Sequence, residues 1–146
     1  MNWLSWHNRD ARDEEFFTFV RGVLRLRRTH PLLRRTKFLH GKPVGENGIV
    51  DVRWLRPDAN DMQKEDWAKP HSRSIAMLLA SSRQQLLALF NAHFETVDFT
   101  LPKSLASGWA ILIDTEAATA GEGLGTADGQ SCRVGGRSLL LLESVA

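Results

Sequence analysis

The chain has 146 residues, of which 42% are hydrophobic and 25% charged, so it is long enough for one domain with its own core. The single cysteine, Cys132, excludes an internal disulfide and a zinc site built on several thiolates. The 19 Lys and Arg against 17 Asp and Glu do not by themselves imply a polyanionic partner, and no run approaches the about 18 apolar residues of a membrane span. No signal peptide is visible, so we expect a cytoplasmic protein without a membrane partner.

The first third of the chain contains the only long helical pattern. Residues 1–10 form a short aromatic lead-in that fits a strand, and residues 10–29 predict a helix. Asp10 and Asp13 are candidate N-caps, Pro31 ends the helix near residue 29, and Gly22 costs it about 1 kcal/mol relative to alanine. Five apolar residues recur at helical spacing and predict one apolar face: Phe16, Phe17, Val20, Val23 and Leu24.

From about residue 36 the apolar pattern changes to that of strands. Strands are predicted at residues 51–56, 74–80, 85–92, 96–101, 109–113, 131–134 and 138–142. Residues 57–71 and 116–130 are predicted to be loops, the first polar and the second rich in Gly, Ala and Thr. Because no helical pattern separates the strands, we expect a mainly β fold in which an N-terminal helix precedes an antiparallel β-sandwich.

The motifs that carry enzyme chemistry are absent from the sequence. The glycine-rich run at residues 121–125 is followed by a strand, whereas a dinucleotide fingerprint requires a helix there, so a flexible connection is favoured. The five histidines lack metal-ligand spacing, no serine has a nucleophile-elbow motif, and a buried thiol is expected at Cys132. We therefore predict no catalytic residue, no metal site and no cofactor.

A basic segment runs from Arg21 to Lys42 without a single acid. Such a cluster can bind phosphates of a nucleic acid, or an acidic partner. It can equally reflect a helix end whose cations favour the dipole. The candidate residues for a basic patch are Arg25, Arg28, Arg34 and Arg35.

Five tryptophans and no tyrosine form an unusual aromatic set. Trp54 and Trp109 lie in predicted strands, so we expect both in the core. Trp67 lies in the polar loop instead, where its ring is the candidate for a glucan contact, because indole rings stack on sugar rings.

Several motifs, in this order, resemble the C-terminal part of bacterial glycogen debranching enzymes of the glycogen-operon, isoamylase-like type in the α-amylase superfamily. They are WLSW at residues 3–6, LRLRRTHPLLRR at 24–35, DVRWLRPD at 51–58, EDW at 65–67, LFNAH at 89–93, VDFTLP at 97–102 and RVGGRSLLL at 133–141. The resemblance covers essentially the whole chain. It departs at Ser5, where the family often has an acid, and at Ala59, where the family usually has glycine after the aspartate.

The resemblance implies that residues 1–35 are the last strand and helix of a (β/α)8 barrel and that residues 36–146 are the C-terminal β-sandwich domain. The family's catalytic carboxylates would lie upstream of Met1, so none is carried over, and we expect a noncatalytic fragment. Its implied partners are the upstream catalytic barrel, in the same or a separate chain, and an α-glucan. A single strand cannot close a barrel, so the apolar face of the helix could instead pack on the sandwich or be buried in a homodimer. The alternatives are a free-standing glucan-binding sandwich and a basic module that binds nucleic acid or an acidic partner.

Overall fold

The computed structural model describes residues 10–44, 48–104, 108–127 and 130–145. The lead-in strand predicted at residues 1–10 lies almost entirely outside this range. The elements, in chain order, are α1 (Ala11–Thr29), the 3-10 helix η1 (Pro31–Arg34), β1 (Pro43–Val44), β2 (Ile49–Val50), β3 (Val52–Leu55), α2 (Lys64–Trp67), β4 (Ser74–Ala80), β5 (Gln85–Asn91), β6 (Val97–Thr100), β7 (Gly108–Asp114), β8 (Thr119–Ala120), β9 (Thr126–Ala127), β10 (Ser131–Val134) and β11 (Ser138–Val145).

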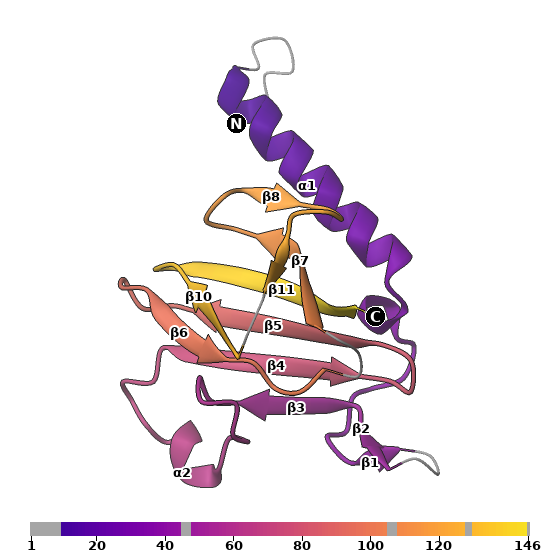
Figure 1. Ribbon diagram of the computed structural model, residues 1–146, viewed down its shortest axis with the longest axis vertical. Coiled ribbons are helices and arrows are strands. Elements are labelled where there is room, and N and C mark those ends of the chain that lie inside the picture. The colour runs from indigo at the N-terminus through magenta and orange to yellow at the C-terminus, as the bar shows by residue number, and fades with distance from the viewer. Residues whose placement is uncertain (1–9, 45–47, 105–107, 128–129, 146) are drawn as a thin grey trace, which may run out of the picture.

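The strands form a large antiparallel sheet covered on both faces (Figure 1). Its strand order is β3-β4-β5-β11-β7-β8, with β9 also paired to β7. A second, two-stranded antiparallel sheet of β6 and β10 covers one face, and α1 and η1 cover the other. The predicted mainly β sandwich with an N-terminal helix is therefore confirmed.

Two hydrophobic cores lie on opposite faces of the large sheet. The core under β6 and β10 contains Phe99 and Val134, and the core under the helix contains Leu26. In β11, Leu140 and Leu142 enter the first core and Leu141 enters the second, because successive side chains in a strand point to opposite faces. Burial on both faces explains why the last strand is a continuous leucine run rather than an alternating pattern.

The helix begins and ends where its capping residues predict. The Asp13 N–H donates to Asp10 Oδ1 at 2.9 Å, and the Asp10 N–H donates back to Asp13 Oδ2 at 3.3 Å, which forms a capping box. At the other end His30 is the C-cap, and its N–H donates to the Leu26 carbonyl at 2.9 Å. Pro31 then starts η1.

The prediction of which side chains form the packed apolar face of α1 is wrong for three of the five residues. Phe16, Phe17 and Leu24 are 67%, 44% and 55% exposed, whereas Phe19, Val23 and Leu26 pack against the sheet. The packed residues are spaced i, i+4, i+7, so they form one stripe along the helix. Leu26 was overlooked because arginines surround it in the sequence.

Both predicted loops contain short regular elements. Residues 57–71 include α2, and residues 116–130 include β8 and β9, which add to the edge of β7. No helix in the described part of the chain has the length and apolar character needed to cross a membrane.

Candidate functional site

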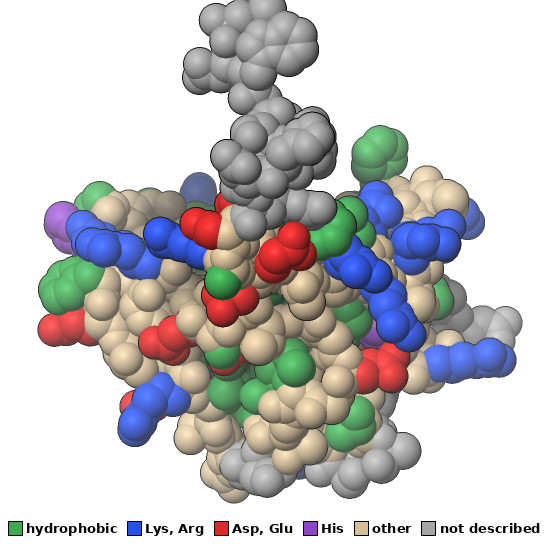
Figure 2. Space-filling model, turned by 90° about the horizontal axis from the view of Figure 1, so that it is seen from above, with side chains coloured by type: hydrophobic (Ala, Val, Ile, Leu, Met, Phe, Trp, Pro, Cys, Tyr) green, Lys and Arg blue, Asp and Glu red, His purple; other side chains and the backbone are tan. Residues whose placement is uncertain are grey.

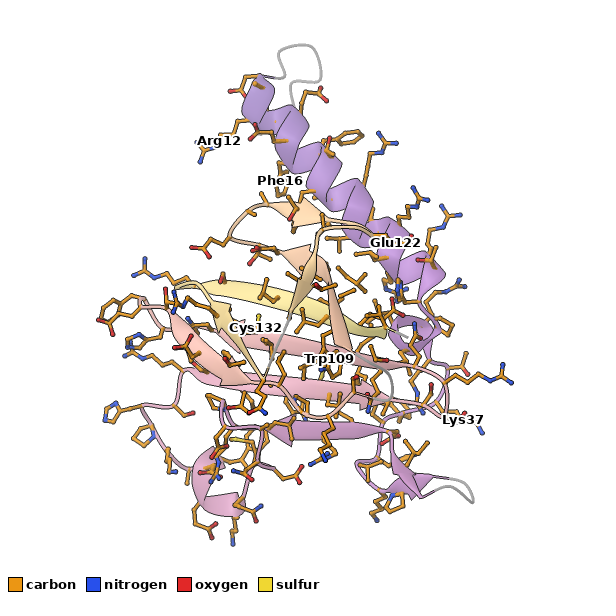
Figure 3. All side chains as sticks on the ribbon, in the orientation of Figure 1. Arg12, Phe16, Lys37, Trp109, Glu122 and Cys132 are labelled. Atoms are coloured by element: carbon orange, nitrogen blue, oxygen red, sulfur yellow. The ribbon has the colours of Figure 1, made fainter. Side chains whose placement is uncertain are left out.

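Two exposed tryptophans lie in contact at the β3 edge of the large sheet. Trp54 comes from β3 and Trp67 from the last position of α2, and their ring centroids are 5.9 Å apart in an edge-to-face arrangement. Trp67 is 56% exposed, as its polar surroundings predict, and Trp54 is 38% exposed. The prediction that Trp54 lies in the core is therefore wrong, whereas Trp109 is buried between the sheets, as expected (Figure 3).

The segment after β3 is folded back on that strand by hydrogen bonds. The Met62 N–H donates to the Trp54 carbonyl at 2.8 Å, and the Arg56 N–H donates to the Asn60 carbonyl at 2.8 Å. These bonds bring α2 beside β3, which is an edge strand, and so place Trp67 against Trp54. Among the described residues β3 is the last strand on this side of the large sheet, so Trp54 has a neighbouring strand on one side only and stays exposed.

A buried carboxylate fixes the short helix that carries Trp67. Asp66 accepts from Lys69 Nζ at 2.7 Å and from the Gln63 N–H at 2.9 Å, and Arg56 Nη1 lies 3.5 Å away. The hydrogen bonds from Lys69 and Gln63 lower the pKa of Asp66. Asp66 therefore stays ionised and holds α2 in place at neutral pH.

Two arginine–aspartate pairs hold the segment that joins β3 to α2. Arg53 donates to both carboxylate oxygens of Asp61 at 2.9 and 2.8 Å, and Arg56 donates to both of Asp58 at 3.2 and 3.0 Å. Hydrogen bonds from Asn60 and Arg56 lower the pKa of Asp58 to about 2. The two exposed rings are what suits a sugar here, since aromatic rings pack on its C–H faces.

The turn at residues 58–60 explains the departure from the family pattern at Ala59. The Asn60 N–H donates to Asp58 Oδ1 at 3.1 Å, which forms an Asx turn. Ala59 has a φ of +63°, in the left-handed region that favours glycine. This chain therefore keeps a glycine-type turn with an alanine at that position.

The four arginines of the predicted basic patch do not act as one group. Arg34 Nη1 donates to the Arg28 carbonyl at 2.9 Å, and Arg35 lies 3.8 Å from the buried Asp51 carboxylate. Arg25 and Arg28 instead line a groove beside α1. Figure 2 shows Lys and Arg side chains on both sides of the face that carries this helix, with the larger group at the right.

The buried Asp51 carboxylate holds the chain segment at residues 40–41 against the start of β3. It accepts from the His40 N–H at 3.1 Å and from the Gly41 N–H at 2.9 Å. Burial alone would raise its pKa, but these hydrogen bonds and the charge of Arg35 outweigh burial, so the pKa of Asp51 lies below its usual value. Arg35 is thus committed to the connection between η1 and the sheet.

No other group in the described residues has the features of a catalytic or metal site. No cluster of three or more His, Cys, Asp or Glu side chains is placed to hold a metal ion. Cys132 is half-buried, and its burial together with the charge of Asp114 raises the pKa of the thiol. A thiol shifted in this direction is a poorer nucleophile at neutral pH.

Comparison with known families identifies the domain. The family model described as Isoamylase, C-terminal, matches residues 51–143, which is more than half of the chain and includes the whole strand system from β3 to most of β11. The chain belongs to the isoamylase C-terminal domain family. The resemblance to the C-terminal part of glycogen debranching enzymes is thereby confirmed.

Similar proteins carry names from glycogen metabolism. The glycogen operon protein GlgX homolog of Mycobacterium tuberculosis is 28% identical over 158 residues, which cover 98% of this chain and 22% of that protein. The isoamylase of a Flavobacterium species is 25% identical over 97% of this chain and 20% of its own length. The glycogen debranching enzyme of Dickeya chrysanthemi is 30% identical over 70% of this chain and 14% of its own length. The chain thus spans about a fifth of the length of the relatives that match nearly all of it.

Proposed function

We propose that this isoamylase C-terminal domain is the noncatalytic end of a cytoplasmic glycogen debranching glycoside hydrolase of the α-1,6-glucosidase type. In this proposal residues 1–35 complete an upstream (β/α)8 barrel, and residues 36–146 form the sandwich that stabilises it. The length of the relatives supports the proposal. Two relatives match nearly all of this chain, and about four fifths of each of those proteins lies outside the matched part.

The unburied half of the apolar surface of α1 is the observation that carries the proposal. The helix turns about 100° per residue. The apolar arc therefore continues from the packed stripe to Phe16, Val20, Leu24 and Phe17, and the last two lie farthest from the sheet. Covering such side chains fully is worth about 1.5–3 kcal/mol each. We call these four exposed or half-buried side chains the second apolar arc. A barrel that packs against the second apolar arc would bury it, as the sheet buries the packed stripe.

Catalysis by this chain alone is not expected. Hydrolysis of a glycosidic bond requires two carboxyl groups across a cleft, about 5–5.5 Å apart in retaining enzymes and about 6.5–9.5 Å in inverting ones. Three carboxylates lie near the tryptophans in the sequence, Asp58, Asp61 and Asp66, and each is engaged by arginine or lysine. They hold the turn in place rather than facing a substrate.

The test adds this chain to a truncated relative. The GlgX homolog of M. tuberculosis, shortened by the fifth that corresponds to this chain, is assayed for debranching and for thermal stability with and without the 146-residue chain. We expect the chain to raise both, and the double variant Phe17→Ser, Leu24→Ser to remove the effect. Phe38→Ser is the control, because Phe38 is 87% exposed and lies outside the helix.

Two results would contradict this proposal. Release of reducing ends from branched glucan by the chain alone would show that it is catalytic. If the Phe17→Ser, Leu24→Ser variant raises debranching and thermal stability as much as the native chain does, the second apolar arc of α1 is not the docking surface. Dimerisation of the chain alone through that arc, measured by sedimentation and lost in the same variant, would favour the homodimer.

The tryptophan pair supports a second role, contact with an α-glucan. In native gels that contain glycogen, we expect retardation of the chain that weakens in Trp67→Ala and in Trp54→Ala but not in Phe38→Ala. The same gel is run with the mixture of the truncated relative and the 146-residue chain. If glycogen retards the chain alone as much as it retards this mixture, the result would favour a free-standing glucan-binding sandwich. No difference between Trp67→Ala and the native chain would exclude Trp67 as the contact.

A further inference from the structure

A groove of about 770 Å3 runs between the C-terminal half of α1 and the turn that follows β8. Its size lies within the about 300–1,000 Å3 of small-ligand sites. Figure 3 shows Glu122, from that turn, beside the helix. The residues that line the groove include three arginines, two threonines and one glutamate: Arg21, Arg25, Arg28, Thr18, Thr29 and Glu122.

The three arginines form one row on the helix. Arg21, Arg25 and Arg28 are spaced i, i+4, i+7, so consecutive members are neighbours on the same side of α1. Among the described residues, none of the three has a carboxylate within 4 Å, whereas Arg35, Arg53, Arg56 and Arg133 all do. The row therefore carries positive charge that the fold itself does not neutralise.

The opposite wall is the glycine-rich turn. Gly121 and Gly123 have φ values of +154° and +77°, and the space where a Cβ would be added is open at both. Since no helix follows this turn, its glycines cannot form a dinucleotide site alone. The tertiary structure places Gly121 and Glu122 in the same groove as the arginine row, which supplies the positive charge that a helix N-terminus would otherwise provide.

The groove combines three arginines with one glutamate, and this combination favours one class of ligand. Guanidinium groups match phosphate oxygens with paired donors. Glu122 would repel a bare polyanion such as a nucleic acid, but its carboxylate can accept from hydroxyl groups, as can the exposed Thr18 hydroxyl. We propose that this groove binds the phosphate monoester of a sugar, with the arginines on the phosphate and Glu122 and Thr18 on the hydroxyls.

This inference does not rest on the tryptophan pair. The groove shares Leu24 with the second apolar arc proposed for barrel docking, so it is tested on the 146-residue chain without a barrel. The phosphate monoester could belong to a free hexose phosphate or to a phosphorylated glucan chain. Titration of the 146-residue chain with glucose 6-phosphate and with a phosphorylated maltooligosaccharide separates these sources. Inorganic phosphate and unmodified glucose are the reference ligands, and calorimetry and phosphorus NMR are the readouts.

We expect saturable binding of glucose 6-phosphate in about the millimolar range and none of glucose. Arg25→Gln and Arg28→Gln should each weaken binding roughly five- to tenfold. Arg27→Gln is the matched control, because Arg27 is exposed on another side of α1 and does not line the groove. Glu122→Gln should reduce the preference for glucose 6-phosphate over inorganic phosphate.

Three results would overturn the proposal. The first is no saturable binding of either sugar phosphate by the native chain. The second is an equal loss in Arg27→Gln and Arg25→Gln, which would indicate diffuse charge rather than a site. The third is tighter binding of a DNA oligonucleotide with a steep salt dependence, which would indicate a polyanion surface. Urea unfolding of every variant checks that lost binding does not reflect lost folding.

Discussion

Gly22 determines how closely α1 approaches β8, and its substitution tests that contact. At an exposed position in a helix, Gly→Ala stabilises by about 1 kcal/mol. Here an added Cβ would lie 2.3 Å from the Ala120 carbonyl oxygen and 2.9 Å from the Ala120 Cβ. The close atom is in the main chain, so it cannot be relieved by a side-chain rotation. The helix or β8 must move instead.

We expect Gly22→Ala to lower the free energy of unfolding by about 1–2 kcal/mol. Overpacking of this kind costs about 1–3 kcal/mol, and the gain in helix propensity offsets part of it. The displaced helix would also loosen the contacts of Phe19, Val23 and Leu26 with the sheet. Ala120→Gly should not rescue the variant, because the carbonyl oxygen remains in place.

Urea denaturation followed by tryptophan fluorescence measures the effect through the midpoint at constant slope. Thr18→Ala is the control, since Thr18 is an exposed residue of the same helix and should change stability by less than about 1 kcal/mol, in the stabilising direction. Stabilisation of Gly22→Ala by about 1 kcal/mol would refute the reasoning, because it would mean that the helix surface at Gly22 faces solvent.

Three further predictions concern stability. Asn91 is 2% exposed and donates to the carbonyls of Glu95, Val134 and Gly135, so Asn91→Leu should cost about 3–5 kcal/mol in urea denaturation, and a loss below about 1 kcal/mol would contradict this role. Ala59 adopts a left-handed φ, so Ala59→Gly should stabilise by about 1 kcal/mol, whereas destabilisation would show that the turn differs. The pKa of Asp58 is about 2 when folded and 3.8 ordinarily, so its contribution to stability is present above pH 4 and is lost as the pH falls from 4 through 2; Asp58→Asn should flatten this part of the stability profile, and an unchanged profile would exclude the contribution.

Features fixed by neighbouring residues were accessible from the sequence. The helix from Ala11 to Thr29 follows from the Asp10 cap and from Pro31, because capping depends on groups within one turn. The seven predicted strands are all present, since short apolar runs or alternations bounded by turn residues are local patterns. The family resemblance could be read from the sequence because its motifs follow one another along the chain, and the family model over residues 51–143 confirms it.

Short elements and the packed face of the helix could not be derived in this way. The strands β8 and β9 have two residues each and form because β7 offers an unpaired edge. Leu26 is buried although arginines surround it, since burial depends on which side of α1 meets the sheet. Trp54 is exposed because its strand is at an edge, and strand order is not encoded in the alternation of one strand.

The sequence by itself determined the long helix, the seven main strands and the family, while the tertiary structure decided which distant residues meet. Trp54 and Trp67 become one site because α2 folds back on β3. The arginine row and the glycine-rich turn, about a hundred positions apart, share one groove because β8 packs on α1. Local periodicity reports the environment of each element, but contacts across such separations depend on strand order, register and packing, which emerge only when the whole chain is folded.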